Sequence, residues 1–215
     1  MCSHDQYDNL ETLEKHECDE MWYKFPEKIP QQFGEEVTLE NAKAIHRFNF
    51  MQDRAAQISW FRHQIDDADS NVTIKFVFVV GHHALWSQGP HAVPKVFNEF
   101  MQPVLRSSNK IIAWFCGHNH ALEHYVWNRG QDREGMETKL TEMHQFLSGS
   151  GGREIHDMSD PPVESIVDDV KLGYLGKEFG FVSVKVGGDT VDVQYWSEKK
   201  QLLHSVQIPF PEYPI

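Results

Sequence analysis

Two apolar runs, each ending in a Gly-His turn, constrain the fold of this chain more than any other feature. The run Val72–Val80 leads into Gly81-His82-His83, and the run Ile111–Cys116 leads into Gly117-His118-Asn119-His120. Apolarity is continuous over Phe76–Val80 in the first run and over the whole of the second, and such stretches, bounded by turn residues, predict strands that are buried on both faces, as in parallel sheets. The sequence therefore predicts two buried strands that each display histidines at their carboxyl end.

The segment between the two runs predicts how they are arranged. Its apolar residues recur at i, i+3, i+4, i+7, i+8 and i+11, which is the stripe of an amphipathic helix: Val93, Val96, Phe97, Phe100, Met101 and Val104. A helical crossover joins parallel strands, so both strands end at the same side of the sheet, where ligands bind in such folds. We therefore expect His82 to lie near His118 and His120, where the three can share one or two metal ions. The thirteen histidines of the chain also allow a simpler interpretation, in which polar turns contain histidine by chance.

The remaining segments are predicted from their periodicity and turn residues. Residues 1–36 are predicted to be an irregular N-terminal segment, and 37–215 to be part of a single domain. The expected elements are a helix at Thr38–Ile65, a turn at Asp66–Asn71, strands at Ala121–Trp127 and Phe146–Ser148, a polar surface loop at Arg153–Lys171, and antiparallel strands at Phe179–Val186, Thr190–Trp196 and Leu202–Ile208. We expect the last three strands to complete a mixed sheet.

Composition restricts the classes of function. The 215 residues carry 20 Lys and Arg against 32 Asp and Glu, a net charge of −12. That balance argues against binding to nucleic acid, which requires clustered positive charge. No stretch is long and apolar enough to predict a membrane span. An anionic substrate such as a phosphate ester would need a local cation, and a metal ion can provide one.

At the histidine turns the sequence resembles a known family. Val79-Val80-Gly81-His82-His83-Ala84-Leu85-Trp86-Ser87 and Trp114-Phe115-Cys116-Gly117-His118-Asn119-His120 resemble the calcineurin-like metallophosphoesterases, and among them the purple (tartrate-resistant) acid phosphatases. Gln57–Phe61 and the glycine-rich segment Phe146–Gly151 extend the resemblance, which covers about 57–209. It implies an α/β fold, the second half of a four-layer αββα sandwich with a mixed sheet, flanking helices and a C-terminal antiparallel hairpin.

The resemblance also implies a mechanism, the hydrolysis of phosphate monoesters by a dinuclear centre of iron with zinc, iron or manganese. His82 and His118 would hold the divalent ion and His120 the iron, while His83 or His91 would protonate the leaving alcohol. In the family a histidine precedes the Gly-Pro that Gly89-Pro90 resembles, whereas this chain has Gln88 there. The family setting suggests a secreted protein or one of the lysosomal or vacuolar lumen.

The carboxylate motifs that the family carries in its first half have no counterpart here. The one Gly-Asp pair, Gly188-Asp189, falls in a predicted hairpin. We therefore interpret the chain as the C-terminal half of such an enzyme, which alone would hold one divalent ion or none. It would expose a sheet edge to the missing N-terminal half or to another partner. Two alternatives stay open: a non-catalytic binding module, and a phosphodiesterase of the same superfamily.

Overall fold

The computed structural model describes residues 39–91, 95–129, 142–158, 165–167 and 169–211. By their contacts, the residues group into two compact units, 1–64 with 94–100 and 65–93 with 101–215. The segment 1–36, predicted to be irregular, lies outside the described residues. The smaller unit contributes most of α3 (Leu39–Ser70) and the start of α4 (Lys95–Arg106).

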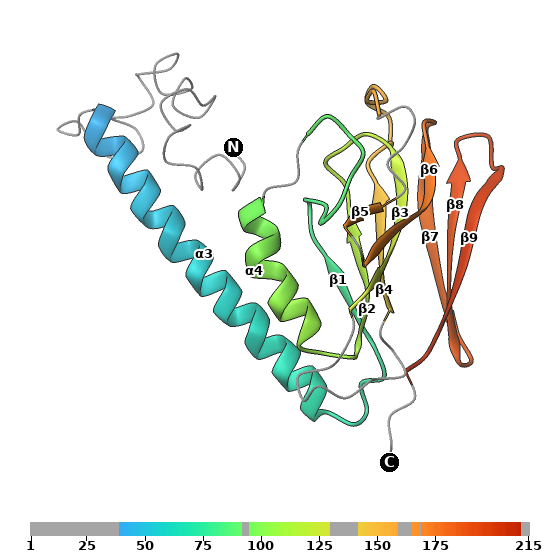
Figure 1. The fold of residues 1–215 in the computed structure, drawn as a ribbon, viewed down its shortest axis with the longest axis horizontal. Helices are drawn as coiled ribbons and strands as arrows, with labels where there is room; N and C mark the ends of the chain where they lie inside the picture. The colour runs from blue at the N-terminus through green and yellow to red at the C-terminus, as the bar shows by residue number, and fades with distance from the viewer. Residues whose placement is uncertain (1–38, 92–94, 130–141, 159–164, 168, 212–215) are drawn as a thin grey trace. The chain divides into compact units, whose positions relative to one another are not determined.

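The larger unit contains a six-stranded mixed sheet with the strand order β1-β2-β4-β3-β6-β5 (Figure 1). Its strands are β1 (Val77–Val80), β2 (Ile111–Cys116), β3 (Leu122–Asn128), β4 (Glu142–Ser148), β5 (Ser165–Val167) and β6 (Val170–Gly176). Strands β1, β2 and β4 are parallel, whereas β3 is antiparallel to β4 and β6, and β5 is antiparallel to β6. The carboxyl ends of the three parallel strands therefore lie at one end of the sheet.

The predicted β-α-β unit is confirmed, because β1 and β2 pair in parallel and α4 connects them. Strand β2 has the predicted bounds, and its burial on both faces follows from its position between β1 and β4. The prediction for the first strand was wrong in two respects. It spans only Val77–Val80, and it lies at the edge of the sheet, where Val80 is 80% exposed. Its preceding residues instead form a turn in which the Asn71 side chain accepts a hydrogen bond from the Thr73 N–H.

The last three strands form a separate sheet, in the order β7-β8-β9 (Figure 1). They are β7 (Gly180–Gly187), β8 (Thr190–Ser197) and β9 (Leu202–Pro209), all antiparallel as predicted. The expectation that they complete the mixed sheet was wrong. Alternate residues of β8 are buried, so the strand has one face in a core and one outside, as a strand of a second layer does.

The two sheets share one core. Buried residues of both sheets form a single apolar cluster: Ile112, Ala113, Leu122 and Phe146 from the first, and Val191, Val193, Tyr195 and Ile208 from the second. The Tyr195 hydroxyl donates to the Glu123 carbonyl across 2.6 Å, so a hydrogen bond also joins the layers. This packing of two sheets gives the ββ layers of the expected sandwich.

The loop predicted at Arg153–Lys171 was too long, because β5 and the start of β6 fall inside it. The helix predicted to end at Ile65 was too short, because α3 continues to Ser70. Lys110 accounts for this extension. Its buried ammonium group donates to the carbonyl oxygens of Ala68 and Asp69 in the last turn of the helix, at 2.8 and 3.1 Å, and of Asn71 just after it, at 2.9 Å.

We predict that Lys110→Met lowers the free energy of unfolding by about 2 kcal/mol, because charge-assisted hydrogen bonds to the helix end are lost while the apolar stem is kept. Urea unfolding followed by circular dichroism measures the change. Lys75→Met is the control, since Lys75 is exposed and reaches one carbonyl, that of Val72, at 3.4 Å. Equal losses in the two variants would contradict the capping role of Lys110.

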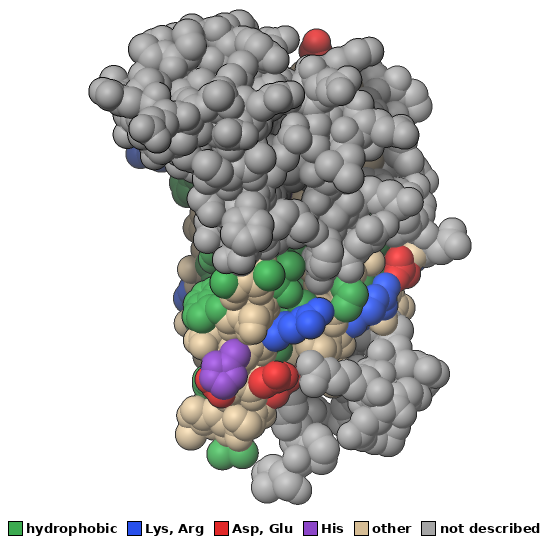
Figure 2. Space-filling model, turned by 90° about the vertical axis from the view of Figure 1, so that its left-hand side faces the viewer, with side chains coloured by type: hydrophobic (Ala, Val, Ile, Leu, Met, Phe, Trp, Pro, Cys, Tyr) green, Lys and Arg blue, Asp and Glu red, His purple; other side chains and the backbone are tan. Residues whose placement is uncertain are grey.

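On the face drawn in Figure 2, Lys and Arg side chains lie among Asp, Glu, His and apolar side chains. The described residues of that face therefore concentrate no charge of one sign. Within the described stretches, no helix combines the length and the apolarity needed to cross a bilayer.

Candidate functional site

The two Gly-His turns lie side by side at the carboxyl ends of β1 and β2, as predicted. The Gly81 N–H donates to the Phe115 carbonyl at 2.9 Å, and the Gly117 N–H donates to the His82 carbonyl at 3.0 Å. These backbone bonds continue the pairing of the strands into the turns. As a result His82 and His118, which are 36 residues apart, meet with Nε2 and Nδ1 at 3.1 Å.

His118 lies at the centre of a group of four imidazoles. Its ring centroid is 4.5 Å from that of His83, 4.9 Å from that of His91 and 5.1 Å from that of His82. Burial, followed by the neighbouring histidines, lowers the pKa of His118 to about 4. His118 is therefore neutral in mild acid, the form in which an imidazole nitrogen can bind a metal ion.

The backbone at His118 is strained. Its φ of 70° lies in the left-handed region, which costs a residue with a side chain about 1–3 kcal/mol and which glycine would adopt without this cost. Two tight turns follow, with the Asn119 N–H donating to the Gly117 carbonyl and the Ala121 N–H to the Asn119 carbonyl, both at 3.0 Å. The surrounding structure thus imposes the conformation that aims this imidazole at His82.

Asn119 fastens the turn to the loop at 84–91. Its amide nitrogen donates to Ser87 Oγ at 2.7 Å and to the His91 carbonyl at 3.1 Å, and its oxygen accepts from the His91 N–H at 3.2 Å. A Cβ on Gly89 would lie 2.3 Å from the Asn119 side chain, so glycine is required for this approach. Asn119, which is 1% exposed, thereby holds His91 next to His118.

His120 lies beside His156, a residue that the sequence analysis did not select. Their rings stack with centroids 3.8 Å apart, and the His120 N–H donates to His156 Nδ1 at 3.0 Å. His120 Nδ1 lies 2.8 Å from the Glu154 carbonyl, which must accept a proton from it, so Nε2 carries the lone pair. The ring of His156 is also 4.8 Å from that of His91.

His156 could have been found from the sequence by the rule that selected the other histidines. It follows the glycine-rich turn after β4, which is a third parallel strand ending at the same side of the sheet. The residue falls instead in Arg153–Lys171, whose polar and acidic composition with Pro161-Pro162 predicts a surface loop.

The histidines fit a metal ion in part. Two imidazole nitrogens at about 2.1 Å from one ion lie about 3.0–3.4 Å apart at usual coordination angles, which matches the His82 and His118 pair. The tautomer of His120 likewise leaves one nitrogen available. However, the described residues contain no group of three or more His, Cys, Asp and Glu side chains arranged to hold a metal ion. These histidines therefore form a partial ligand set.

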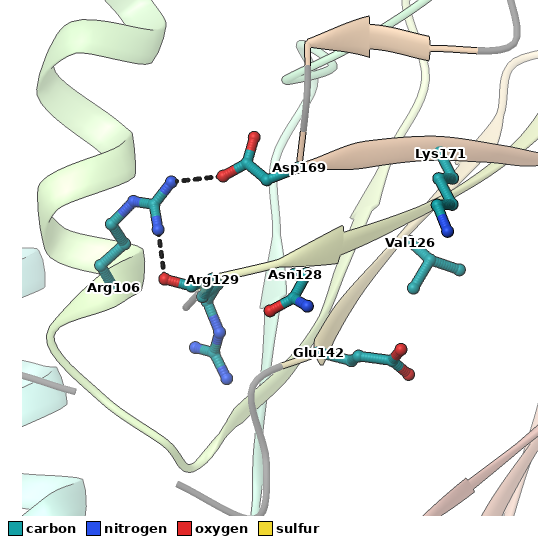
Figure 3. A pocket seen from close by; sticks show the side chains of 7 residues that line it. All are labelled: Arg106, Val126, Asn128, Arg129, Glu142, Asp169 and Lys171. Carbon is teal, nitrogen blue, oxygen red and sulfur yellow. Dashed lines mark hydrogen bonds and ion pairs between the residues drawn. The ribbon is translucent and has the colours of Figure 1, made fainter. Parts of the chain in front are cut away.

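A hollow of about 430 Å³ lies at the opposite end of the sheet, near the end of β3 and the start of β4 (Figure 3). Three of its charged groups, Arg106, Arg129 and Asp169, are engaged in hydrogen bonds of the fold. Arg106 donates to the Arg129 carbonyl and to Asp169 Oδ2, which lies 2.8 Å away and also accepts from Trp127 Nε1. Burial alone would raise the pKa of Asp169, but these hydrogen bonds hold it below its usual value. The Arg129 guanidinium points away from Lys171 (Figure 3). It donates to the carbonyls of Leu105 and Ser108. We assign this hollow no chemistry.

The sandwich of two sheets, with histidines at the carboxyl ends of parallel strands, agrees with an α/β metallophosphoesterase fold. No family model matches the chain. Its sequence is similar to purple acid phosphatase 4 of Arabidopsis thaliana, at 29% identity over 60% of this chain and 33% of that protein. It is also similar to tartrate-resistant acid phosphatase type 5 of Sus scrofa, at 26% identity over 71% of this chain and 40% of that protein.

Two solved structures show the same fold. One is a purple acid phosphatase from yellow lupin (Lupinus luteus) seeds, with a TM-score of 0.55 over 69% of this chain and 28% of that chain, at 15% identity. The other is GAP50, described as the anchor in the inner membrane complex of Plasmodium, with a TM-score of 0.52 over 72% and 42%, at 15% identity. The matched part spans between 33% and 43% of the curated relatives. The chain is thus similar to the purple acid phosphatases over part of their length, and it has a calcineurin-like fold.

Proposed function

We propose that this chain supplies the histidine half of a phosphoesterase centre that hydrolyses phosphate monoesters. The approach of His82 Nε2 and His118 Nδ1 to 3.1 Å carries this proposal, because it places two imidazole nitrogens where parallel sheets bind their ligands. The similarity to acid phosphatases supports the reaction class.

In this proposal His82 and His118 hold a divalent ion and His120 holds iron through Nε2. When bound, the ions would provide Lewis acidity and lower the pKa of a water molecule. His91 is the better placed of the two candidates for protonating the leaving alcohol, since Asn119 fixes its backbone on both sides. His83 is the other candidate, with its ring 4.5 Å from that of His118.

The remaining ligands would come from a partner, which we propose to be a chain or segment that carries carboxylates and pairs with β1. Among the described strands, β1 ends the order of the sheet, and Val80 next to the histidine turn is 80% exposed. A parallel strand paired there would end beside His82. We propose neither a nucleic acid nor a membrane as a partner.

Metal titration tests the histidine roles. We expect the 215-residue chain to bind at most one zinc ion by calorimetry and to hydrolyse p-nitrophenyl phosphate weakly, because the carboxylates are missing. His118→Ala should weaken zinc binding at least tenfold, the scale on which even outer-shell changes act. His63→Ala, which removes an exposed histidine of α3, should leave binding unchanged. Stoichiometric iron with rapid turnover in the isolated chain would contradict the proposal of half a centre.

A second candidate is a binding module without catalysis. Two observations favour it: the partial ligand set among the described residues, and the fold match to a protein described as an anchor. In that case partner binding would survive His118→Ala.

Comparing monoester and diester substrates on the completed centre would separate a phosphatase from a phosphodiesterase.

A further inference from the structure

Two buried histidines and one half-buried histidine outside the candidate site form a row that joins the two sheets. His124 of β3 occupies the middle, with Nδ1 at 3.1 Å from His204 Nε2 of β9 and Nε2 at 3.0 Å from His144 Nδ1 of β4. His124 and His144 are 3% and 8% exposed. The row thus links residues up to 80 positions apart and crosses from the six-stranded to the three-stranded sheet.

Aromatic rings enclose this His204–His124–His144 row. The Phe146 ring stacks on His124 at 4.8 Å with an interplanar angle of 6°, and the Tyr174 ring stacks on His204 at 4.8 Å with an angle of 3°. Gly173 of β6 makes room for the middle ring, since a Cβ there would lie 2.6 Å from His124 Nδ1. The enclosure is apolar and close, which disfavours water and charge.

The hydrogen bonds in the row suit neutral rings. A neutral imidazole has one N–H donor and one acceptor nitrogen, so three of them can bond in series with every proton pointing the same way. Protonation turns both nitrogens of a ring into donors. Two protonated neighbours would therefore direct N–H against N–H and separate.

Among the residues that the structure describes, the ionisable groups that face the row give a positive charge no compensation. They are the phenols of Tyr174 and Tyr195, whose rings lie 4.8 and 5.9 Å from that of His204, and the Arg129 guanidinium, whose charge acts on His144. Burial, followed by its two histidine neighbours, lowers the pKa of His124 to about 3. Burial and then Arg129 lower the pKa of His144 to about 4, and burial lowers the pKa of His204.

We propose that the His204–His124–His144 row makes the packing of the two sheets sensitive to acid. While its rings are neutral, the row holds β7–β9 against the six-stranded sheet. In mild acid, protonation of the histidines in the opened form favours the separation of β7–β9. The direction follows from linkage. Opened histidines take up protons below about pH 6.5, whereas in the closed row the pKa is about 3 for His124, about 4 for His144 and lowered by burial for His204. The closed form therefore loses stability as the pH falls below about 6.5, by up to about tenfold in the equilibrium constant per histidine and pH unit.

The test compares urea unfolding at pH 7.5 and pH 5.0. We expect the unfolding equilibrium constant of the unmodified chain to rise steeply between these values. The triple variant His124→Phe, His144→Phe and His204→Phe replaces the row by apolar rings, and its pH response should be at least a hundredfold smaller. His63→Gln removes an exposed histidine and should retain the full response. An unchanged response in the triple variant overturns the proposal.

Two measurements on the unmodified chain decide the matter even if the triple variant does not fold. Nitrogen-15 NMR of the imidazoles should show neutral rings at His124 and His144 in the folded chain at pH 5.5. Amide hydrogen exchange should show that residues 180–209 lose protection as the pH falls from 7 to 5. A folded chain with these rings protonated near pH 6.5, or with protection of 180–209 independent of pH, overturns the proposal. Neither outcome depends on a metal ion or on the proposed function.

Discussion

Replacing Gly149 by alanine is expected to lower the free energy of unfolding by about 3 kcal/mol or more, the upper range for overpacking. A Cβ at this position would lie 1.8 Å from the carbonyl oxygen of Asn119 and 3.3 Å from the Cα of His120. These atoms belong to the backbone of the histidine turn and cannot rotate away. The Gly149 N–H also donates to the Ala121 carbonyl at 2.9 Å, so the two turns are fixed against each other.

Gly151 provides a matched control two residues further along the same glycine-rich turn. A Cβ there meets no atom within 4 Å, so Gly151→Ala should change stability by less than about 0.5 kcal/mol. Chemical denaturation of both variants gives the comparison. Gly149→Ala should also weaken zinc binding, because the displaced backbone carries His118 and His120. Similar stability in the two variants would show that the turn can shift without cost.

The arrangement around the histidine turns could be predicted because the signals that define it are local. Ile111–Cys116 is continuously apolar and lies between two neighbours, and the helical stripe before it requires a parallel crossover. These two facts were enough to bring His82 to His118. For Val72–Val80 the same apolar signal was misleading, since it does not show that a strand has a neighbour on one side only.

Long-range contacts decided what the sequence did not show. Lys110, which is 39 or more residues away in the sequence, caps the end of α3, and the residues near Ser70 do not indicate this contact. Buried and less buried residues alternate along β8, but a strand added to the edge of a sheet and a strand of a second layer can both alternate in this way. The row of His124, His144 and His204 arises only once the two sheets pack, so the spacing of these histidines carries no sign of it.

Glu123 is a buried carboxylate that organises the loop next to the site. It is 0% exposed, and burial raises its pKa. Its Oε1 accepts from Ser87 Oγ at 2.7 Å, and its Oε2 accepts from the Gln88 N–H at 3.0 Å and the Tyr125 hydroxyl at 2.5 Å. Gln145 holds the start of the same loop through the N–H groups of Leu85 and Trp86. The loop that carries His91 is thus fixed by two buried side chains of β3 and β4.

Glu123→Gln is expected to lower the free energy of unfolding by about 2–3 kcal/mol although it conserves shape, because it leaves a buried donor without an acceptor. Ser87 Oγ accepts from the Gly89 N–H and from Asn119 Nδ2, so its own proton must go to Glu123. If the amide of the substituted side chain keeps its oxygen toward the Gln88 N–H, its NH₂ group points at the Ser87 hydroxyl. If the amide is flipped, its NH₂ group faces the two other donors, the Gln88 N–H and the Tyr125 hydroxyl.

Tyr125→Phe is the control for this prediction. It removes one donor to the carboxylate and leaves the Ser87 bond intact, so we expect a loss of about 1 kcal/mol. Thermal unfolding gives both values, and hydrogen exchange at 84–91 should rise in Glu123→Gln but not in Tyr125→Phe. Because Asn119 depends on Ser87 and fixes His91, the glutamine variant should also loosen His91 from His118. If Glu123→Gln is as stable as Tyr125→Phe, the loop tolerates an amide in place of the buried carboxylate. Glu123 would then stabilise the loop through its shape alone.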